Sequence, residues 1–97
     1  MTVSVLLTIP VKPDRLDDFL ALIREIAPDT RAFEGCLNFD IYVTEDGSGN
    51  VHFLEDWTTQ EQHMKYSAWR VETGLADQLA PLLNGPPTPV YCHRFDG

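Results

Sequence analysis

The residues best suited to chemistry lie close together in the middle of the chain. Side chains alternate in polarity along residues 51–57, which predicts a β-strand with Glu55 and Trp57 on the same face. His63 follows six residues after this strand. An imidazole titrates near neutral pH and can serve as a general base or as a hydrogen-bond donor to a substrate oxygen. The sequence therefore suggests one pocket lined by Glu55, Trp57 and His63, although a helix histidine can equally be an ordinary surface residue.

The helix that would carry His63 has a recognisable start. Thr58 and Glu61 have the spacing of a capping box, in which a threonine hydroxyl and a carboxylate satisfy backbone donors of the first turn. The pattern predicts that the helix begins at Thr58 or Thr59. His63 then falls in the second turn, close to the end of the strand that carries Glu55.

Aromatic side chains near this strand could form a flat wall for a planar ligand. The candidates are Phe39, Phe53, Trp57 and Trp69, and Asn38 could add a hydrogen-bond donor. Aromatic residues at such spacings also commonly belong to a hydrophobic core. Asn38 could equally face an interface between two copies of the chain, so both interpretations stay open.

The remaining elements follow from hydrophobic periodicity. Alternation predicts strands over residues 3–11 and 36–44, and residues 90–95 supply a last strand. Apolar residues three and four apart predict a helix from about Asp14 and a second helical region that is broken near Gly74. The order β-α-β-β-α-β indicates an α+β, ferredoxin-like fold, in which an antiparallel sheet carries helices on one face. The other face is then uncovered, so we expect a homodimer.

Two positions within these elements carry specific expectations. Leu37 should lie on the apolar face of the second strand, together with Phe39 and Ile41. Pro28 has no amide hydrogen for the carbonyl of Arg24, so the first helix should either kink there or restart as a short turn.

These segments together resemble a known family. Residues 55–63, with Phe33-Glu34-Gly35-Cys36-Leu37-Asn38-Phe39-Asp40 upstream, are similar to the antibiotic biosynthesis monooxygenase domain. Residues 11–13, 27–32 and 80–87 match it as well, so the resemblance covers almost the whole chain. It implies one domain over residues 1–97, a first helix that continues past its proline, and two sheets packed face to face in a dimeric α+β barrel.

The resemblance also implies a function. A monooxygenase of this type acts without metal, flavin or other cofactor on a small electron-rich aromatic, such as a quinol or polyphenol. The substrate's own phenolate or carbanion reduces dioxygen, so the protein need only deprotonate it and exclude water. His63 would be the base, and Phe53, Trp57 and Trp69 the apolar wall.

Other functions remain open from the sequence. The fold also hosts isomerases of small metabolites and dimeric ligand-binding modules without turnover. Haem degradation would need a pocket asparagine on the first strand in the family pattern, and residues 4–8 contain none.

Composition narrows the partners and the location. Seven basic against fifteen acidic residues give a net charge of −8, which disfavours binding to nucleic acid or to an anionic membrane. We expect a cytoplasmic protein, since the N-terminal residues lack a signal-peptide pattern and no apolar run is long enough to span a membrane. Cys36 and Cys92 should stay unpaired, on opposite edges of the predicted sheet. His52, His63 and His93 lack metal-binding spacing, so no metal site is expected.

Overall fold

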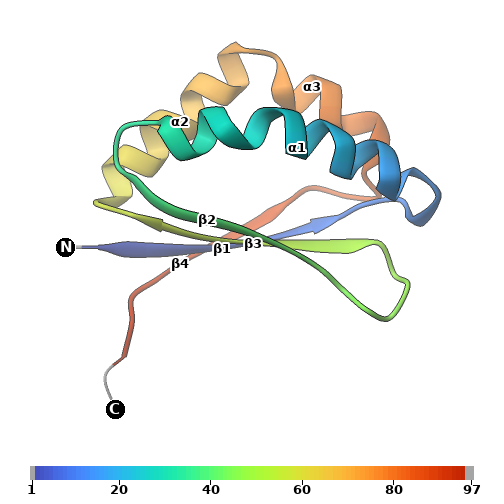
Figure 1. Cartoon of the computed structure of the whole chain (residues 1–97), viewed down its shortest axis with the longest axis horizontal. Helices are drawn as coiled ribbons and strands as arrows, with labels where there is room; N and C mark the ends of the chain where they lie inside the picture. The colour runs from blue at the N-terminus through green and yellow to red at the C-terminus, as the bar shows by residue number, and fades with distance from the viewer. Residues whose placement is uncertain (1, 96–97) are drawn as a thin grey trace.

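The computed structural model describes residues 2–95. In this part of the chain, three α-helices all cover one face of a four-stranded antiparallel sheet (Figure 1). The elements in chain order are β1 (Val3–Pro10), the short 3-10 helix η1 (Pro13–Arg15), α1 (Leu16–Ala32), β2 (Cys36–Val43), β3 (Asn50–Trp57), α2 (Gln60–Glu72), α3 (Leu75–Leu79), the 3-10 helix η2 (Ala80–Leu82) and β4 (Thr88–Cys92). The α+β, ferredoxin-like prediction is confirmed.

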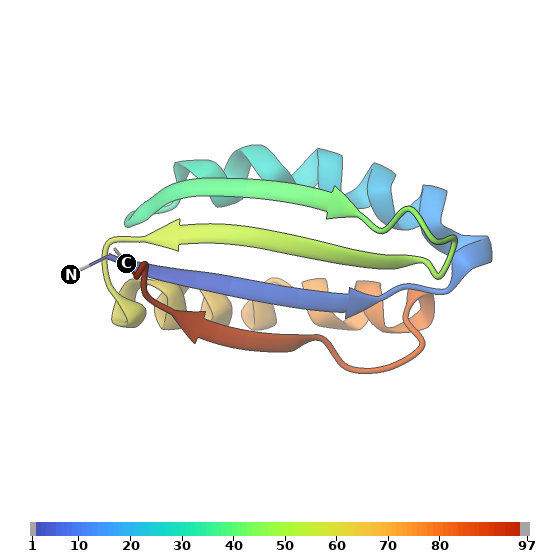
Figure 2. The same ribbon diagram turned by 90° about the horizontal axis from the view of Figure 1, so that it is seen from below.

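The strands lie in the order β2-β3-β1-β4, and each neighbouring pair is antiparallel. Figure 2 shows the sheet from the side that no helix covers. β2 and β4 form the two edges, which places Cys36 and Cys92 on opposite sides of the sheet. Both cysteines are free thiols, as expected.

Buried and partly buried side chains alternate along β3. Val51, Phe53, Glu55 and Trp57 are all buried beneath the helices, whereas the residues between them are only partly buried. α1 packs against these residues with its apolar face, on which Phe19 and other buried side chains lie one or two helical turns from one another. The predicted grouping of these four residues on one face is therefore confirmed, and the structure shows that this face is buried, with Glu55 on it.

Two expectations for the helices are confirmed: the continuation of the first helix past Pro28, which the family resemblance implies, and the break near Gly74. Pro28 lies inside α1, and the helix continues to Ala32 without restarting. Gly74 has a backbone φ of +82°, a left-handed conformation that glycine adopts at little cost, and it separates α2 from α3.

The predicted position of Leu37 is wrong. The pairing of β2 with β3 shifts by one residue between Cys36 and Asn38, which leaves Leu37 as the extra residue of a bulge. Its side chain is 58% exposed. After the shift, Phe39 lies opposite Glu55 and is buried as the sequence predicts.

Two predictions at the ends of elements also differ from the structure. The helix cap is Thr59, one of the two predicted starts, and not Thr58 of the predicted capping box: Thr59 Oγ1 accepts from the backbone N–H of Gln62 at 3.1 Å, and the backbone N–H of Thr58 donates to the carbonyl of Gly35. The last strand spans Thr88–Cys92 and not residues 90–95. It ends there because Cys92 already pairs with Ser4, one residue from the start of β1.

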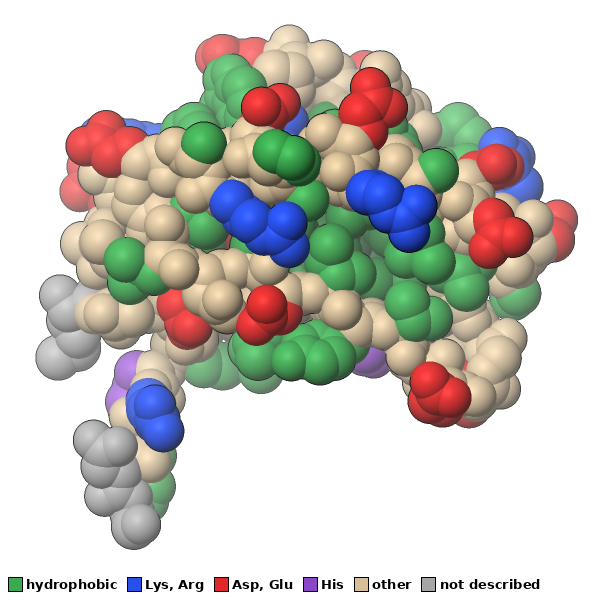
Figure 3. All heavy atoms as spheres, viewed as in Figure 1, with side chains coloured by type: hydrophobic (Ala, Val, Ile, Leu, Met, Phe, Trp, Pro, Cys, Tyr) green, Lys and Arg blue, Asp and Glu red, His purple; other side chains and the backbone are tan. Residues whose placement is uncertain are grey.

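The described surface matches the acidic composition. On the face seen in Figure 3, acidic side chains are spread widely and do not gather into one patch. Within residues 2–95, none of the helices combines the length and the apolar character needed to cross a bilayer.

Candidate active site

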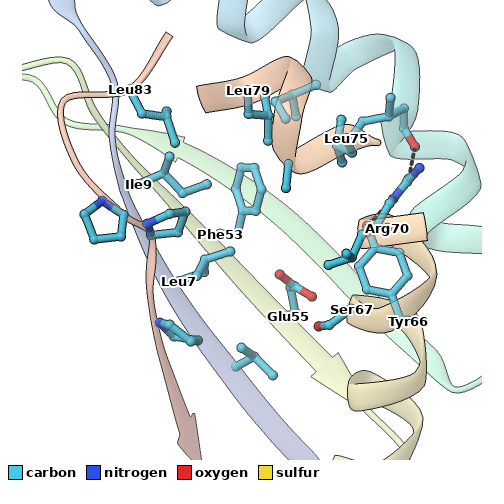
Figure 4. A pocket seen from close by; sticks show the side chains of 18 of the residues that line it. Leu7, Ile9, Phe53, Glu55, Tyr66, Ser67, Arg70, Leu75, Leu79 and Leu83 are labelled. Carbon is cyan, nitrogen blue, oxygen red and sulfur yellow. Dashed lines mark hydrogen bonds between the residues drawn. The ribbon is translucent and has the colours of Figure 1, made fainter. Parts of the chain in front are cut away.

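A cavity of about 700 Å³ lies between the inner face of the sheet and the helices above it. This volume falls within the range of roughly 300–1,000 Å³ that is usual for small-molecule sites. Its wall is mostly aliphatic and aromatic, with side chains from β1, β3, α2, α3 and the segment before β4 (Figure 4). The polar side chains on the wall include Glu55, His63, Tyr66, Ser67, Arg70 and Tyr91.

Glu55 is the buried acid of this cavity. It is only 2% exposed, and Figure 4 shows its carboxyl group directed into the space between β3 and α2. Burial raises the pKa of this carboxyl group, and a hydrogen bond from Trp57 acts in the opposite direction. In that bond the indole Nε1–H of Trp57 donates to Glu55 Oε1 at 2.9 Å. The carboxyl group is thus held in place and is a stronger base, once ionised, than an exposed glutamate.

His63 faces Glu55 from the first turns of α2. Its ring is 7% exposed, and Nε2 lies 3.8 Å from Glu55 Oε1. Its Nδ1 is hydrogen-bonded to the hydroxyl oxygen of Tyr91 at 2.8 Å. Burial lowers the pKa of His63, so the ring is neutral at neutral pH and can accept a proton.

The structure brings four of the seven predicted site residues together. Glu55, His63, Phe39 and Phe53 all line the cavity. The two phenylalanine rings pack edge to face with their centroids 4.9 Å apart and form part of its apolar wall.

The other three predicted residues are not among those that line the cavity. Trp57 is completely buried in the core and touches the site through its bond to Glu55. Trp69 lies further along α2, where the guanidinium of Arg70 stacks over its ring at 4.5 Å. Asn38 donates a hydrogen bond to Asp40 at 2.8 Å and pairs with Asp56, whose side chain points away from the helices.

Sequence reasoning missed several polar residues of the cavity wall, among them Tyr66, Arg70 and Tyr91. Tyr66 and Arg70 follow His63 at intervals of three and four, so helical spacing alone places them on the same face of α2. Tyr91 pairs with Val5 of β1, and this pairing puts it on the inner face of the sheet. Alternation within the last strand could have indicated that face, but not its approach to His63.

Arg70 ties α2 to α1 at one side of the cavity. Its Nε donates to the hydroxyl of Tyr66 at 2.8 Å, and Nη2 donates to Thr30 Oγ1 at 2.9 Å and to the carbonyl of Ile26 at 3.1 Å. Figure 4 shows its guanidinium turned toward α1, away from Glu55. Uncharged oxygen atoms thus satisfy this cation, and its contacts fix the distance between the two helices.

In the part of the chain that the structure describes, no three His, Cys, Asp or Glu side chains lie close enough together to hold a metal ion. Glu55 and His63 can move a proton, and the apolar wall can hold a flat ligand beside them.

Comparison with known proteins agrees with this fold. The fold places the chain among the ferredoxin-like α+β proteins, with helices on one face of the sheet and a cavity beneath them. The family model for antibiotic biosynthesis monooxygenase matches residues 2–70, so the chain belongs to that family. No curated protein matches the sequence.

Solved structures show the same fold. Rv0793 from Mycobacterium tuberculosis is 22% identical with a TM-score of 0.85, over 100% of this chain and 98% of that one. A structure described as an antibiotic biosynthesis monooxygenase is 25% identical with a TM-score of 0.85, over 96% and 98%. A conserved protein from Methanosarcina mazei Go1 is 17% identical with a TM-score of 0.86, over 98% and 94%.

Proposed function

We propose that this protein is a monooxygenase that uses no metal or flavin and acts on a small electron-rich aromatic, such as a quinol or polyphenol. The observation that carries the proposal is the approach of His63 Nε2 to Glu55 Oε1, 3.8 Å apart, at the wall of an apolar cavity of about 700 Å³. Membership of the monooxygenase family supports the reaction class. The cavity supports a flat, largely apolar substrate.

The position of His63 suits a bound hydroxyl group. A hydroxyl oxygen about 2.8 Å from His63 Nε2 can donate its one hydrogen to that nitrogen, while Glu55 Oε1, 3.8 Å from the same nitrogen, accepts from Trp57. His63 Nε2 takes the proton of that hydroxyl, and the carboxylate of Glu55 stabilises the imidazolium that forms. Trp57 serves this step through Glu55, because its indole holds the carboxylate in position.

Loss of the proton makes the substrate electron-rich enough to reduce dioxygen. A ring carbon of the phenolate then gains one oxygen atom as a carbonyl, which gives a quinone, and the second oxygen atom leaves as water with the one hydrogen of that carbon and the hydroxyl proton that His63 took. The four electrons that dioxygen takes up all come from the substrate. Phe39 and Phe53 hold the ring and exclude water from the reacting carbon.

Oxygen uptake by the protein with a panel of quinols and polyphenols tests this function. We expect uptake above the rate without protein, and one atom of ¹⁸O₂ in the product. A rearranged product without labelled oxygen would identify an isomerase. Saturable binding without any product would identify a ligand-binding module, and either outcome would contradict the proposal.

We also propose that two copies pair through the uncovered face of the sheet. Large apolar side chains are exposed on that face: Leu6 is 44% exposed, Val90 50% and Tyr42 54%. Their pairing positions place Leu6 beside both Leu54 and Val90, so the apolar surface is continuous across three strands. Light scattering should give a dimer at micromolar concentration, and a monomer would contradict this pairing.

A further inference from the structure

The hydroxyl group of Tyr91 joins the interior of the cavity to the surface. Its oxygen lies 2.8 Å from His63 Nδ1. Tyr91 is 38% exposed, and besides the main cavity it lines a shallow surface hollow with Thr2, Val3, Gln60, Cys92 and His93. One side of this phenol therefore faces the buried imidazole, and the other faces solvent.

The direction of this hydrogen bond decides which nitrogen of His63 can act as a base. If the phenol donates, Nδ1 is the acceptor and the neutral ring carries its proton on Nε2, which faces Glu55. If the phenol accepts, the proton is on Nδ1 and Nε2 keeps its lone pair. Only the second arrangement leaves a nitrogen of His63 directed at the cavity as a proton acceptor.

The surroundings of the ring favour the second arrangement. Nε2 lies 3.8 Å from Glu55 Oε1, which is beyond hydrogen-bond distance, so a proton on Nε2 would have no partner there. A proton on Nδ1 has the phenolic oxygen at 2.8 Å. The hydrogen of Tyr91 is then free to bond to solvent, which the exposed side of the ring allows.

We propose that Tyr91 is a positioning residue, whose hydroxyl oxygen accepts from Nδ1–H of His63 and so keeps the Nε2 lone pair facing Glu55 and the cavity. The consequence for catalysis rests on the proposed function, in which Nε2 takes the substrate's proton. The assignment of the proton to Nδ1 rests only on the contacts of the two ring nitrogens of His63.

The groups around His63 are compatible with this arrangement. Glu55 faces the ring from β3 and Tyr91 from β4, and Tyr66 lies on α2 itself with its ring centroid 6.3 Å away. Burial raises the pKa of Tyr91, and the charge of Glu55 adds to this, so the phenol keeps its hydrogen at neutral pH. Arg70, which shares the cavity wall, is bonded to Tyr66 and directed toward α1.

Nitrogen NMR of the histidine side chains in the whole protein tests the proposal without substrate. The three histidines are distinguished by the signal that disappears in His63→Gln. In the parent protein we expect Nδ1 of His63 to be the protonated nitrogen above the pKa of the ring. In Tyr91→Phe, the Nε2–H form should become populated, and the pKa of His63 should fall by about 0.5 to 1 unit, because the imidazolium loses an acceptor that bonds it more strongly than the neutral ring.

Tyr42→Phe is the matched control, because it removes a phenolic hydroxyl from β2 at a 54% exposed position opposite His52. It should leave the signals of His63 unchanged. A parent protein with the proton on Nε2 would overturn the proposal, and this measurement needs no substitution at Tyr91. A rise in the pKa of His63 in Tyr91→Phe would also overturn it, because a phenol that donates stabilises the neutral ring. An absence of oxygen uptake would refute the proposed function and leave the tautomer result standing.

Discussion

Replacement of Glu55 by glutamine should change how the stability of the protein depends on pH. The substitution keeps the shape of the side chain and an oxygen that can accept from Trp57 Nε1, but it removes the buried charge. Burial raises the folded-state pKa of Glu55 above its ordinary value of 4.5. At pH values between 4.5 and the higher pKa of the folded state, the folded protein retains a proton that the unfolded chain has lost. The parent protein therefore loses stability as pH rises through this window.

The size of the effect follows from this difference in bound protons. One proton bound only in the folded state lowers the free energy of unfolding by up to about 1.4 kcal/mol for each pH unit within the window. For a domain of this size that corresponds to a fall in Tm of about 6 to 11 °C per pH unit, relative to Glu55→Gln. Below pH 4.5 the two curves should run parallel, because the carboxyl group is then protonated in both states.

Thermal unfolding at a series of pH values and at one protein concentration measures this difference. His63 is present in both proteins, so its own titration largely cancels. Glu61→Gln is the matched control, because it removes the same charge from a side chain that is 82% exposed on α2, and its curve should follow that of the parent. Parallel curves for the parent and Glu55→Gln would refute the account of Glu55 as a buried acid. A parent that gains stability with rising pH, relative to the variant, would show that His63 or Trp57 lowers the pKa of this carboxyl group.

Two further predictions concern the framework of the site. Gly35→Ala should lower the free energy of unfolding by about 1–3 kcal/mol in chemical denaturation, because Gly35 has a φ of +93° and an added Cβ would lie 2.7 Å from Gln62 Cβ. Gly47→Ala has a similar φ of +77° but an open surrounding, so a loss as large as that of Gly35→Ala would argue against the steric explanation. Cys36 and Cys92 should both be modified when the unfolded protein is alkylated without reductant, and a monomer two protons lighter with neither thiol modified would contradict their separation across the sheet.

Local patterns in the sequence predict part of the site because those patterns have a direct structural meaning. Alternation along residues 51–57 gives the face of Glu55, since a strand has a period of two residues. The threonines before α2 give the position of His63 within one residue, since a hydroxyl must satisfy the first amides of a helix. The two residues therefore meet as the sequence predicts.

Other features depend on contacts between distant segments. The approach of Tyr91 to His63 requires β4 to lie beside β1 in the register that pairs Tyr91 with Val5, and alternation alone does not specify that register. The exposure of Leu37 depends on a bulge, which changes the face of a residue without changing its hydrophobicity. Trp69 belongs to the stack around Arg70 and not to the cavity wall, and only the packing of α2 against α1 decides this.

The turnover of a confirmed substrate by His63→Ala tests the central claim most directly. If His63 Nε2 takes the substrate's proton beside Glu55, oxygen uptake should fall by about 10²-fold to 10⁴-fold, the usual contribution of a positioned general base. Circular dichroism and light scattering should show the same fold and assembly as the parent protein. Full activity in a folded His63→Ala protein would contradict the account and would show that this histidine only fills space beside Trp57.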